Sequence, residues 1–215
     1  ISGFTVFIKN YQFLSFLLIL YQAPDLPNTE ELKQTARERM GAIVCVNDIG
    51  TSGSLHLSGS QLSNSSTGII QGNGSVAIDT TLASGNGLDN AGTVYSKGAL
   101  NVTAADDIAN SGQLLADGNL TLSTGSALAD LANSGRIQSG AAMVLGAADH
   151  RFNLNNSNAN SVILAGSTLT SHGGSLTNLG TVQATTGATV TATSFTNSGS
   201  DAAFIVSTVV LIIIL

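Results

Sequence analysis

An internal repeat constrains this chain more than any other feature of its sequence. The segment 110–122 aligns without a gap with segments 90–102 and 133–145, and segment 66–78 keeps the same glycines and apolar positions. The unit recurs about every 19 to 26 residues, with two degenerate units in the one longer step, and its anchoring glycines are Gly68, Gly92, Gly112, Gly135, Gly180 and Gly199. A repeat of this length restricts the fold to one in which similar units stack on each other.

Within each unit apolar and polar residues alternate, which is typical of strands with one buried face. One unit is too short to bury its own apolar face, but stacked units can. The pattern therefore predicts an all-β, parallel β-helix that rises about 4.8 Å per turn, the usual distance between paired strands. The expected inward columns are Val94, Leu114, Ile137 and Val182; Leu100, Leu120 and Met143; and Val102, Leu122 and Leu145, with the small residues Ser96, Ala116, Ser139 and Ala184 tightening a corner.

An asparagine stands two residues before five of the anchoring glycines, and an apolar residue stands two residues before each asparagine. Asn-x-Gly favours a tight turn, because glycine adopts positive φ at little cost. Identical asparagines at successive levels are also able to form a ladder of side-chain amides. The asparagines are Asn90, Asn110, Asn133, Asn178 and Asn197, and the apolar residues are Leu88, Ile108, Leu131, Leu176 and Phe195.

The repeat divides the chain into a non-repeat segment (1–48), the repeat region (49–200) and an apolar tail (201–215). The apolar stretch near the start is interpreted as an upstream remnant or a non-native reading frame, with a secretion signal as the alternative. Residues 28–41 predict one short helix, with polar N-cap candidates at its start and Gly41 at its end. Residues 149–160 predict a bulged loop, and the tail is interpreted as a truncation or frameshift product.

Composition limits the range of partners. The net charge is −6 and only 9% of the residues are charged. A nucleic-acid partner is not expected, because binding to phosphates requires a basic surface. Cys45 is the sole cysteine, so the chain has no disulfide framework.

The sequence contains no recognisable catalytic motif, such as Gly-x-Ser-x-Gly or His-Glu-x-x-His. No catalytic, cofactor-binding or metal-binding residue is predicted, and no cofactor. The scattered histidines His56, His150 and His172 are interpreted as surface residues. Asp106 and Asp107 are interpreted as turn residues, because neighbours in a strand point to opposite faces. The chain is therefore not expected to be an enzyme.

The aligned units disfavour two types of solenoid that bind a ligand on one face. A polysaccharide lyase or hydrolase needs stacked carboxylates, whereas the aligned turn position holds Lys97, Asp117 and Gly140. An ice-binding surface needs ranks of threonine. The threonines at 185, 189, 191 and 193 lie in one coil, and the alignment predicts no matching threonines in the neighbouring coils.

The unit Leu-x-Asn-Ser-Gly-x-Ile-x-Ser/Ala, best seen in residues 108–122 and 131–139, resembles the repeats of filamentous haemagglutinin. These repeats occur in the large exoproteins of bacterial two-partner secretion. The resemblance covers about residues 49–200 and implies a right-handed parallel β-helix, secreted or held at the cell surface, that is exported through an outer-membrane transporter. No site residue is carried over from it.

The leading functional hypothesis is a structural shaft of a bacterial adhesin that contacts a receptor on a host or neighbouring cell. The stalk of a contact-dependent growth inhibition toxin is the alternative. A β-helical polysaccharide lyase or hydrolase is the third and less favoured hypothesis.

Overall fold

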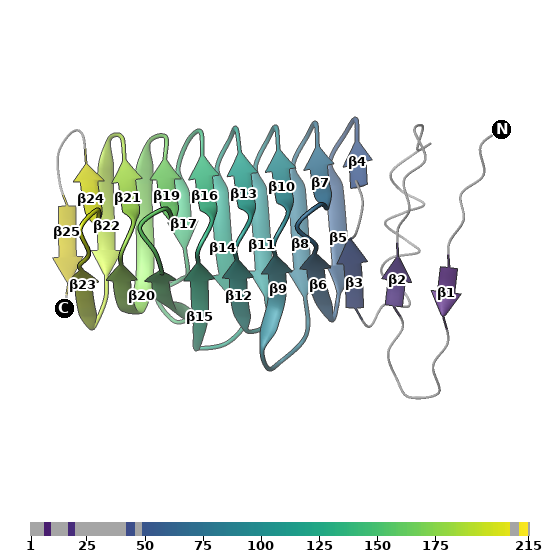
Figure 1. Ribbon diagram of the computed structural model, residues 1–215, viewed down its shortest axis with the longest axis horizontal. Helices are drawn as coiled ribbons and strands as arrows, with labels where there is room; N and C mark the ends of the chain where they lie inside the picture. Colours follow the sequence, from purple (N-terminus) through teal and green to yellow (C-terminus); the bar gives the residue numbers. More distant parts are fainter. Residues whose placement is uncertain (1–6, 10–16, 20–41, 46–48, 207–210, 215) are drawn as a thin grey trace.

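The repeats stack as successive turns of a parallel β-solenoid, seen as a row of aligned strands in Figure 1. The computed structural model describes residues 7–9, 17–19, 42–45, 49–206 and 211–214, and all regular elements within these ranges are strands. The predicted all-β, parallel β-helix is therefore confirmed. The helix predicted at residues 28–41 lies outside the described residues.

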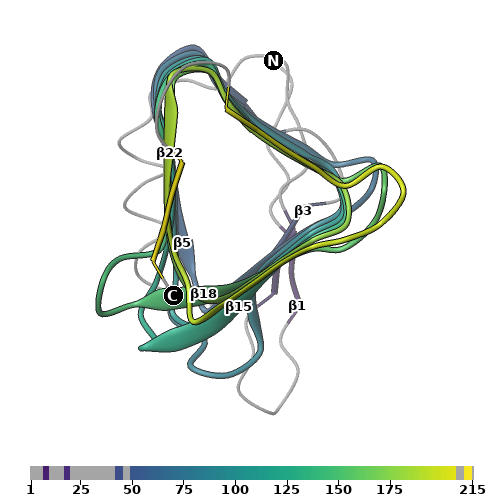
Figure 2. The same cartoon turned by 90° about the vertical axis from the view of Figure 1, so that its left-hand side faces the viewer.

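The cross-section of the solenoid is triangular (Figure 2), so each turn supplies one strand to each of three faces. Face 1 is an eight-stranded parallel sheet. Its strands, in order along the rod, are β4 (Ile49–Thr51), β7 (Ile69–Gly72), β10 (Thr93–Ser96), β13 (Gln113–Ala116), β16 (Arg136–Ser139), β19 (Val162–Ala165), β21 (Thr181–Ala184) and β24 (Ala203–Val206).

Faces 2 and 3 are joined by one long strand, β20 (Thr168–Asn178), whose first half belongs to face 2 and whose second half belongs to face 3. The other strands of face 2 are β5 (Leu55–Gly59), β8 (Val76–Thr80), β11 (Leu100–Ala104), β14 (Leu120–Thr124), β17 (Met143–Leu145), β22 (Gly187–Thr191) and β25 (Leu211–Ile214). Those of face 3 are β3 (Ala42–Cys45), β6 (Gln61–Asn64), β9 (Asn86–Asn90), β12 (Asp107–Asn110), β15 (Leu128–Asn133), β18 (Arg151–Asn156) and β23 (Ser194–Asn197).

Strands also form in the two flanking segments. In the first segment, β3 pairs in parallel with β6 and extends face 3, β2 (Leu17–Ile19) pairs in parallel with β3, and β1 (Phe7–Lys9) is antiparallel to β2. In the tail, β24 pairs with β21 and β25 pairs with β22, so the parallel pairing of faces 1 and 2 continues past residue 200.

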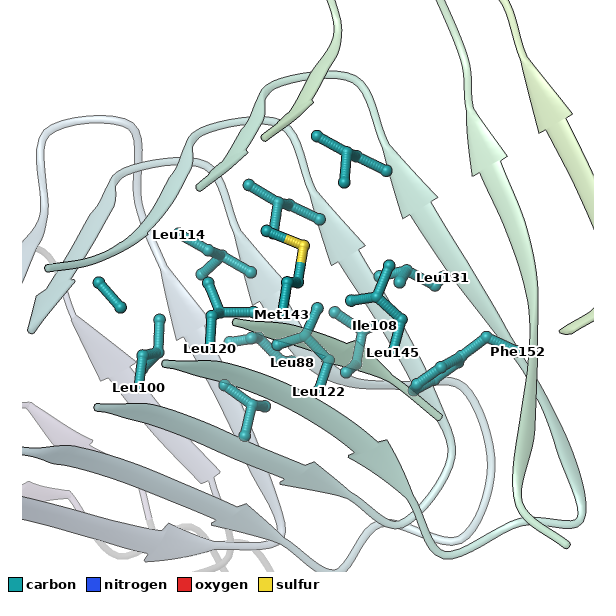
Figure 3. Packing of buried hydrophobic residues seen from close by; sticks show 14 of the residues in the cluster. Leu88, Leu100, Ile108, Leu114, Leu120, Leu122, Leu131, Met143, Leu145 and Phe152 are labelled. Atoms are coloured by element: carbon teal, nitrogen blue, oxygen red, sulfur yellow. The ribbon is translucent and has the colours of Figure 1, made fainter. Parts of the chain in front are cut away.

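The strand register follows the sequence alignment, and it places the predicted apolar columns inside the solenoid. Val94 pairs with Leu114 and Leu114 with Ile137, while Leu120 pairs with Met143. All predicted inward residues are buried, and so are the four small corner residues. Figure 3 shows leucines from successive turns gathered around Met143, with Phe152 at one end of the group. Because each turn covers the apolar side chains of the next, the core is one continuous column.

The predicted loop at residues 149–160 is wrong for its central part. Residues 151–156 form β18, which pairs with β15 and β20 and buries Phe152, Leu154 and Asn156. The polar residues between these three point outward and hide the alternation in the sequence. Irregular backbone is confined to the residues on either side of the strand.

Four of the anchoring glycines, Gly92, Gly112, Gly135 and Gly180, have a different role from the one predicted, whereas Gly199 has the predicted positive φ. Among the described glycines, only Gly85, Gly146 and Gly199 have positive φ. At Gly112 the constraint is space: a Cβ there would collide with the backbone carbonyl oxygen of Gly92, one turn below. The same collision recurs at the equivalent glycines Gly92, Gly135 and Gly180. Glycine is needed at these corners because successive turns approach each other closely.

Candidate functional site: the asparagine ladder and the outer faces

A ladder of asparagine side chains runs along the corner where face 3 meets face 1. In each of six steps, the Nδ2 atom of one asparagine donates to the Oδ1 atom of the asparagine one turn further along, at 2.7 or 2.8 Å. The members are Asn64, Asn90, Asn110, Asn133, Asn156, Asn178 and Asn197. Each is the last residue of its strand on face 3, and all except the last are buried. The predicted amide ladder is present.

Each ladder amide also holds the backbone of the corner. The Nδ2 atom of Asn110 lies 3.3 Å from the carbonyl oxygen of Gly112 in its own turn and 3.2 Å from that of Arg136 in the next turn. The same pair of contacts recurs at Asn90 and Asn133. The backbone carbonyl groups of a tight corner would otherwise be unpaired, and here they accept hydrogen bonds from the ladder amides. Buried polar groups require such a partner.

The prediction missed two ladder members, Asn64 and Asn156, because neither precedes the glycine of an Asn-x-Gly turn. The signal that identifies them is Leu-x-Asn, as in Leu62-Ser-Asn64 and Leu154-Asn-Asn156. The Oδ1 atom of Asn64 is buried and has no hydrogen-bond partner among the described residues. In the turn below, Cys45 is in register with Asn64, so the ladder position there is occupied by a residue without an amide.

The three histidines lie on different turns and do not gather into one site. His56 on β5 contacts Asp79 on β8, with 2.5 Å between Nε2 and Oδ2, and both side chains are partly exposed. His150 contacts its neighbour Asp149 at 3.1 Å, and this contact holds the pKa of the Asp149 carboxyl below its usual value. His172 lies on β20 and is half-buried.

Asp106 and Asp107 make separate contacts. Asp106 accepts hydrogen bonds from the backbone N–H of Gly85 at 3.1 Å and from the hydroxyl of Ser126 at 2.9 Å. Asp107, at the start of β12, accepts the backbone N–H of Asp130 at 2.7 Å. The two carboxylates therefore do not form a pair.

Asp107 instead belongs to a column of polar side chains on the outside of face 3. This column is separate from the aligned turn position that holds Lys97, Asp117 and Gly140. Asp107 accepts from the backbone of Asp130, and the carboxylate of Asp130 accepts the Asn153 side-chain amide at 3.0 Å. Asn153 in turn accepts the hydroxyl of Ser175 at 3.2 Å. Both carboxylates act here as hydrogen-bond acceptors between turns.

One threonine of face 2 does align with a threonine in the neighbouring turn, although no continuous rank of threonines forms, since Thr191 is in register with His172. Thr189 pairs with Thr170, which pairs with Val144, which pairs with Thr121. The sequence alignment missed the pair of Thr189 and Thr170 because the units differ in length.

On face 1, Tyr95 reaches the turn position that holds Lys97 and Asp117. Its hydroxyl donates to Oδ2 of Asp117 at 2.7 Å. This hydrogen bond stabilises the protonated phenol and raises the pKa of Tyr95 above its ordinary value of 10.0.

Within the part of the chain that the structure describes, no group of three or more His, Cys, Asp or Glu side chains is arranged to hold a metal ion. The same residues include no helix with the length and apolar character needed to cross a membrane. Comparisons with protein-family models, curated proteins and solved structures find no match to this chain.

Proposed function

We propose that this chain is a shaft segment of a secreted or cell-surface bacterial adhesin of the filamentous haemagglutinin type, without catalytic activity of its own. The observation that carries the proposal is the asparagine ladder, whose six amide-to-amide bonds fix successive turns at one register along the rod. A rod held in this way is suited to placing a binding end at a distance from its anchor, because each added turn lengthens it by about 4.8 Å.

The right-handed winding implied by the resemblance is part of this proposal. In Figure 1 the chain ascends on the near side through β12 and β13, and descends on the fainter far side through β14, while successive turns advance toward β24. This path supports a right-handed coil, which is also the preferred hand for parallel strands joined by a crossover.

The proposed partners are an outer-membrane two-partner-secretion transporter and a receptor on a host or neighbouring cell. The net charge of −6 favours partners other than nucleic acids. In a stacked solenoid each turn contacts mainly its neighbours. A shaft is therefore expected to tolerate the loss of one whole turn, whereas a reactive site in that turn would be destroyed.

The first test is immunogold labelling of intact, unpermeabilised cells of the native bacterium with antibodies raised against residues 49–206. The proposal predicts label at the cell surface, and loss of that label when the partner transporter gene is deleted. Label seen only after permeabilisation would contradict it.

The second test separates a shaft from a site. Deleting residues 110–132 removes one repeat and joins Ala109 to Asn133, so the ladder remains continuous. Adhesion of the bacterium to its target cells should persist with the shorter shaft. Loss of adhesion with normal surface display would mean that this turn itself carries the activity. Normal adhesion after removal of the entire repeat region would exclude a role in adhesion.

A further inference from the structure

Tyr95 is unusual among the aromatic residues of the solenoid because it lies on the outer surface. Residues 49–206 contain four aromatic residues, and the phenylalanines Phe152, Phe195 and Phe204 lie in the core or pack against it. On β10 the inward residues are Val94 and Ser96, so Tyr95 faces outward on face 1 and is half-buried.

The Tyr95 ring is held in one orientation. Tyr95 is in register with Leu115 of the next strand, yet its hydroxyl bonds to Asp117, two residues further along that strand. A bond in this direction requires the ring to lean across the outer surface of β13. The ring is therefore positioned before any ligand arrives, and binding to it loses little side-chain entropy.

Planar polar side chains occupy the same column on either side of the ring. Gln71 is in register with Tyr95 one turn below, and Gln138 is in register with Leu115 one turn above. Gln138 is itself fixed, because its Oε1 atom accepts a hydrogen bond from Nε of Arg136 at 2.6 Å. The column therefore runs from Gln71 through Tyr95 and Leu115 to Gln138, so amides that both donate and accept lie one turn below and two turns above Tyr95, with the carboxylate acceptor of Asp117 bonded to its hydroxyl.

We propose that Tyr95, Asp117 and Gln138 form a binding site for a neutral glycan on face 1. The negative face of an aromatic ring attracts the C–H groups of a pyranose, and amide and carboxylate groups beside it pair with the sugar hydroxyls. A protein with a net charge of −6 disfavours anionic sugars. Because the three residues belong to successive turns of a flat sheet, the ligand is a chain of sugars that runs along the rod. This activity goes beyond the proposed shaft function, because a shaft need not bind a ligand along its length.

The experiment uses the purified full chain on a printed panel of neutral β-linked oligosaccharides of glucose, galactose, mannose and N-acetylglucosamine, with polygalacturonate as an anionic comparison. The wild type should bind at least one neutral glycan in preference to polygalacturonate. Tyr95→Ala should weaken that binding by roughly tenfold or more, which corresponds to about 1.4 kcal/mol. Tyr95→Phe keeps the ring face and should weaken it less.

Gln183→Ala is the matched control, because Gln183 faces outward in the same column of face 1, two turns beyond Gln138. It should leave binding unchanged, and thermal melts of all variants should match the wild type, since these side chains lie outside the core. No binding to any neutral glycan, a preference for polygalacturonate, or equal binding by wild type and a folded Tyr95→Ala variant would overturn the proposal. None of these results depends on secretion or adhesion, so the shaft function is tested separately.

Discussion

Each asparagine of the ladder is a polar side chain that the fold places in a buried corner. Burying an amide is unfavourable unless its donors and acceptors are paired. At Asn110 the Oδ1 atom receives a hydrogen from Asn90, and the Nδ2 atom donates to Asn133 and contacts two backbone carbonyls. A slip of one residue between turns would leave these groups unpaired, so the ladder fixes the register as well as stabilising the corner.

The contribution of the ladder to stability can be isolated by making the substitution of asparagine by aspartate at a ladder position and, for comparison, at an exposed position. Asn110→Asp replaces the amide that donates to Asn133 Oδ1 with a buried carboxylate. We expect it to lower the free energy of unfolding by at least about 2 kcal/mol at neutral pH, from the unpaired acceptor and the buried charge. Asn119→Asp should be nearly neutral, because Asn119 is exposed and an aspartate retains the oxygen that accepts Ala142 N–H.

The pH dependence of the Asn110→Asp variant provides an internal check. Burial raises the folded-state pKa of the new carboxyl above its unfolded value of about 3.9. The destabilisation caused by the charge should therefore be smallest below that unfolded pKa, and should grow as pH rises through the folded-state pKa. Urea unfolding of both variants across this range is the measurement, and equal stability of the two variants at neutral pH would contradict the ladder's role.

The first described member of the ladder offers a gain of stability. The Oδ1 atom of Asn64 is buried and has no partner within the described part of the chain, and Cys45 occupies the matching position in the turn below. Cys45→Asn places an amide at that register, and we expect it to stabilise the fold by about 1 kcal/mol, the usual net value of a hydrogen bond. Cys45→Ala, which supplies no donor, is the control. Chemical denaturation should rank the asparagine variant above the alanine variant, and the opposite order would show that the ladder does not continue to residue 45.

Most members of the ladder can be predicted from the sequence, because Asn-x-Gly recurs at Asn90, Asn110 and Asn133. Asn64 and Asn156 were not predicted, because the turn takes another form there and only Leu-x-Asn remains. The outward column from Asp107 to Asn153 was also missed. Its members are unlike one another, and only the strand register brings them together.

At the scale of the strand, the corners limit which residues are allowed. Strands on one face end where the chain bends toward the next face, and neighbouring turns bend at the same place. At Gly112 the backbone approaches the carbonyl oxygen of Gly92 too closely to leave room for a side chain. The recurring glycine is therefore required by the packing of turns, which a single unit of sequence does not reveal.

Two glycine substitutions test this explanation. Gly112→Ala should destabilise the protein by about 1 to 3 kcal/mol, the range expected for overpacking, because backbone atoms would have to move. Gly53→Ala should stay within about 0.5 kcal/mol of the wild type, since a Cβ at Gly53 has no other atom within 4 Å. Thermal unfolding of the two variants is the measurement. An equally mild effect at both positions would mean that the corner is looser than described.

The predicted loop at residues 149–160 shows where strand prediction fails. The buried residues Phe152, Leu154 and Asn156 alternate correctly, but polar neighbours and a buried asparagine lower the apparent hydrophobicity of the segment. The register match between Thr189 and Thr170 was missed for a related reason. Loops of different length separate equivalent strands, so a constant period misaligns their outward residues.

At the scale of the whole molecule, stability is distributed along a continuous column of inward side chains. Leu120 is fully buried and pairs with Leu100 below and Met143 above. Leu120→Asp places an unpaired charge in this column and should lower the free energy of unfolding by more than about 3 kcal/mol.

The damage should spread to the neighbouring turns, because the energy of a solenoid resides largely in contacts between turns. Hydrogen exchange should show the largest loss of protection in β11, β14 and β17, and less in β4. Asn119→Asp is the adjacent exposed control. Equal melting temperatures for the two variants would mean that the inward and outward faces are assigned wrongly.

The architecture as a whole was the easiest feature to predict, since apolar residues at one spacing in successive units allow few alternatives to stacking. The parallel pairing and the buried columns follow from that spacing. The triangular section and the path of β20 around a corner do not, because they depend on how individual turns close.

The most direct test of the stacked solenoid is a set of distances along one outer column. Ala77, Asn101 and Thr121 lie five, four and three turns from Thr189 through successive register pairs on face 2. Spin labels are attached to pairs made with Thr189→Cys and one of Ala77→Cys, Asn101→Cys or Thr121→Cys, in a Cys45→Ser background. At about 4.8 Å per turn the backbone separations are roughly 24, 19 and 14 Å, and the label-to-label distances from electron paramagnetic resonance should shorten in the same order. Equal steps in this order are predicted, and separations that fail to shorten turn by turn would contradict the stacked fold.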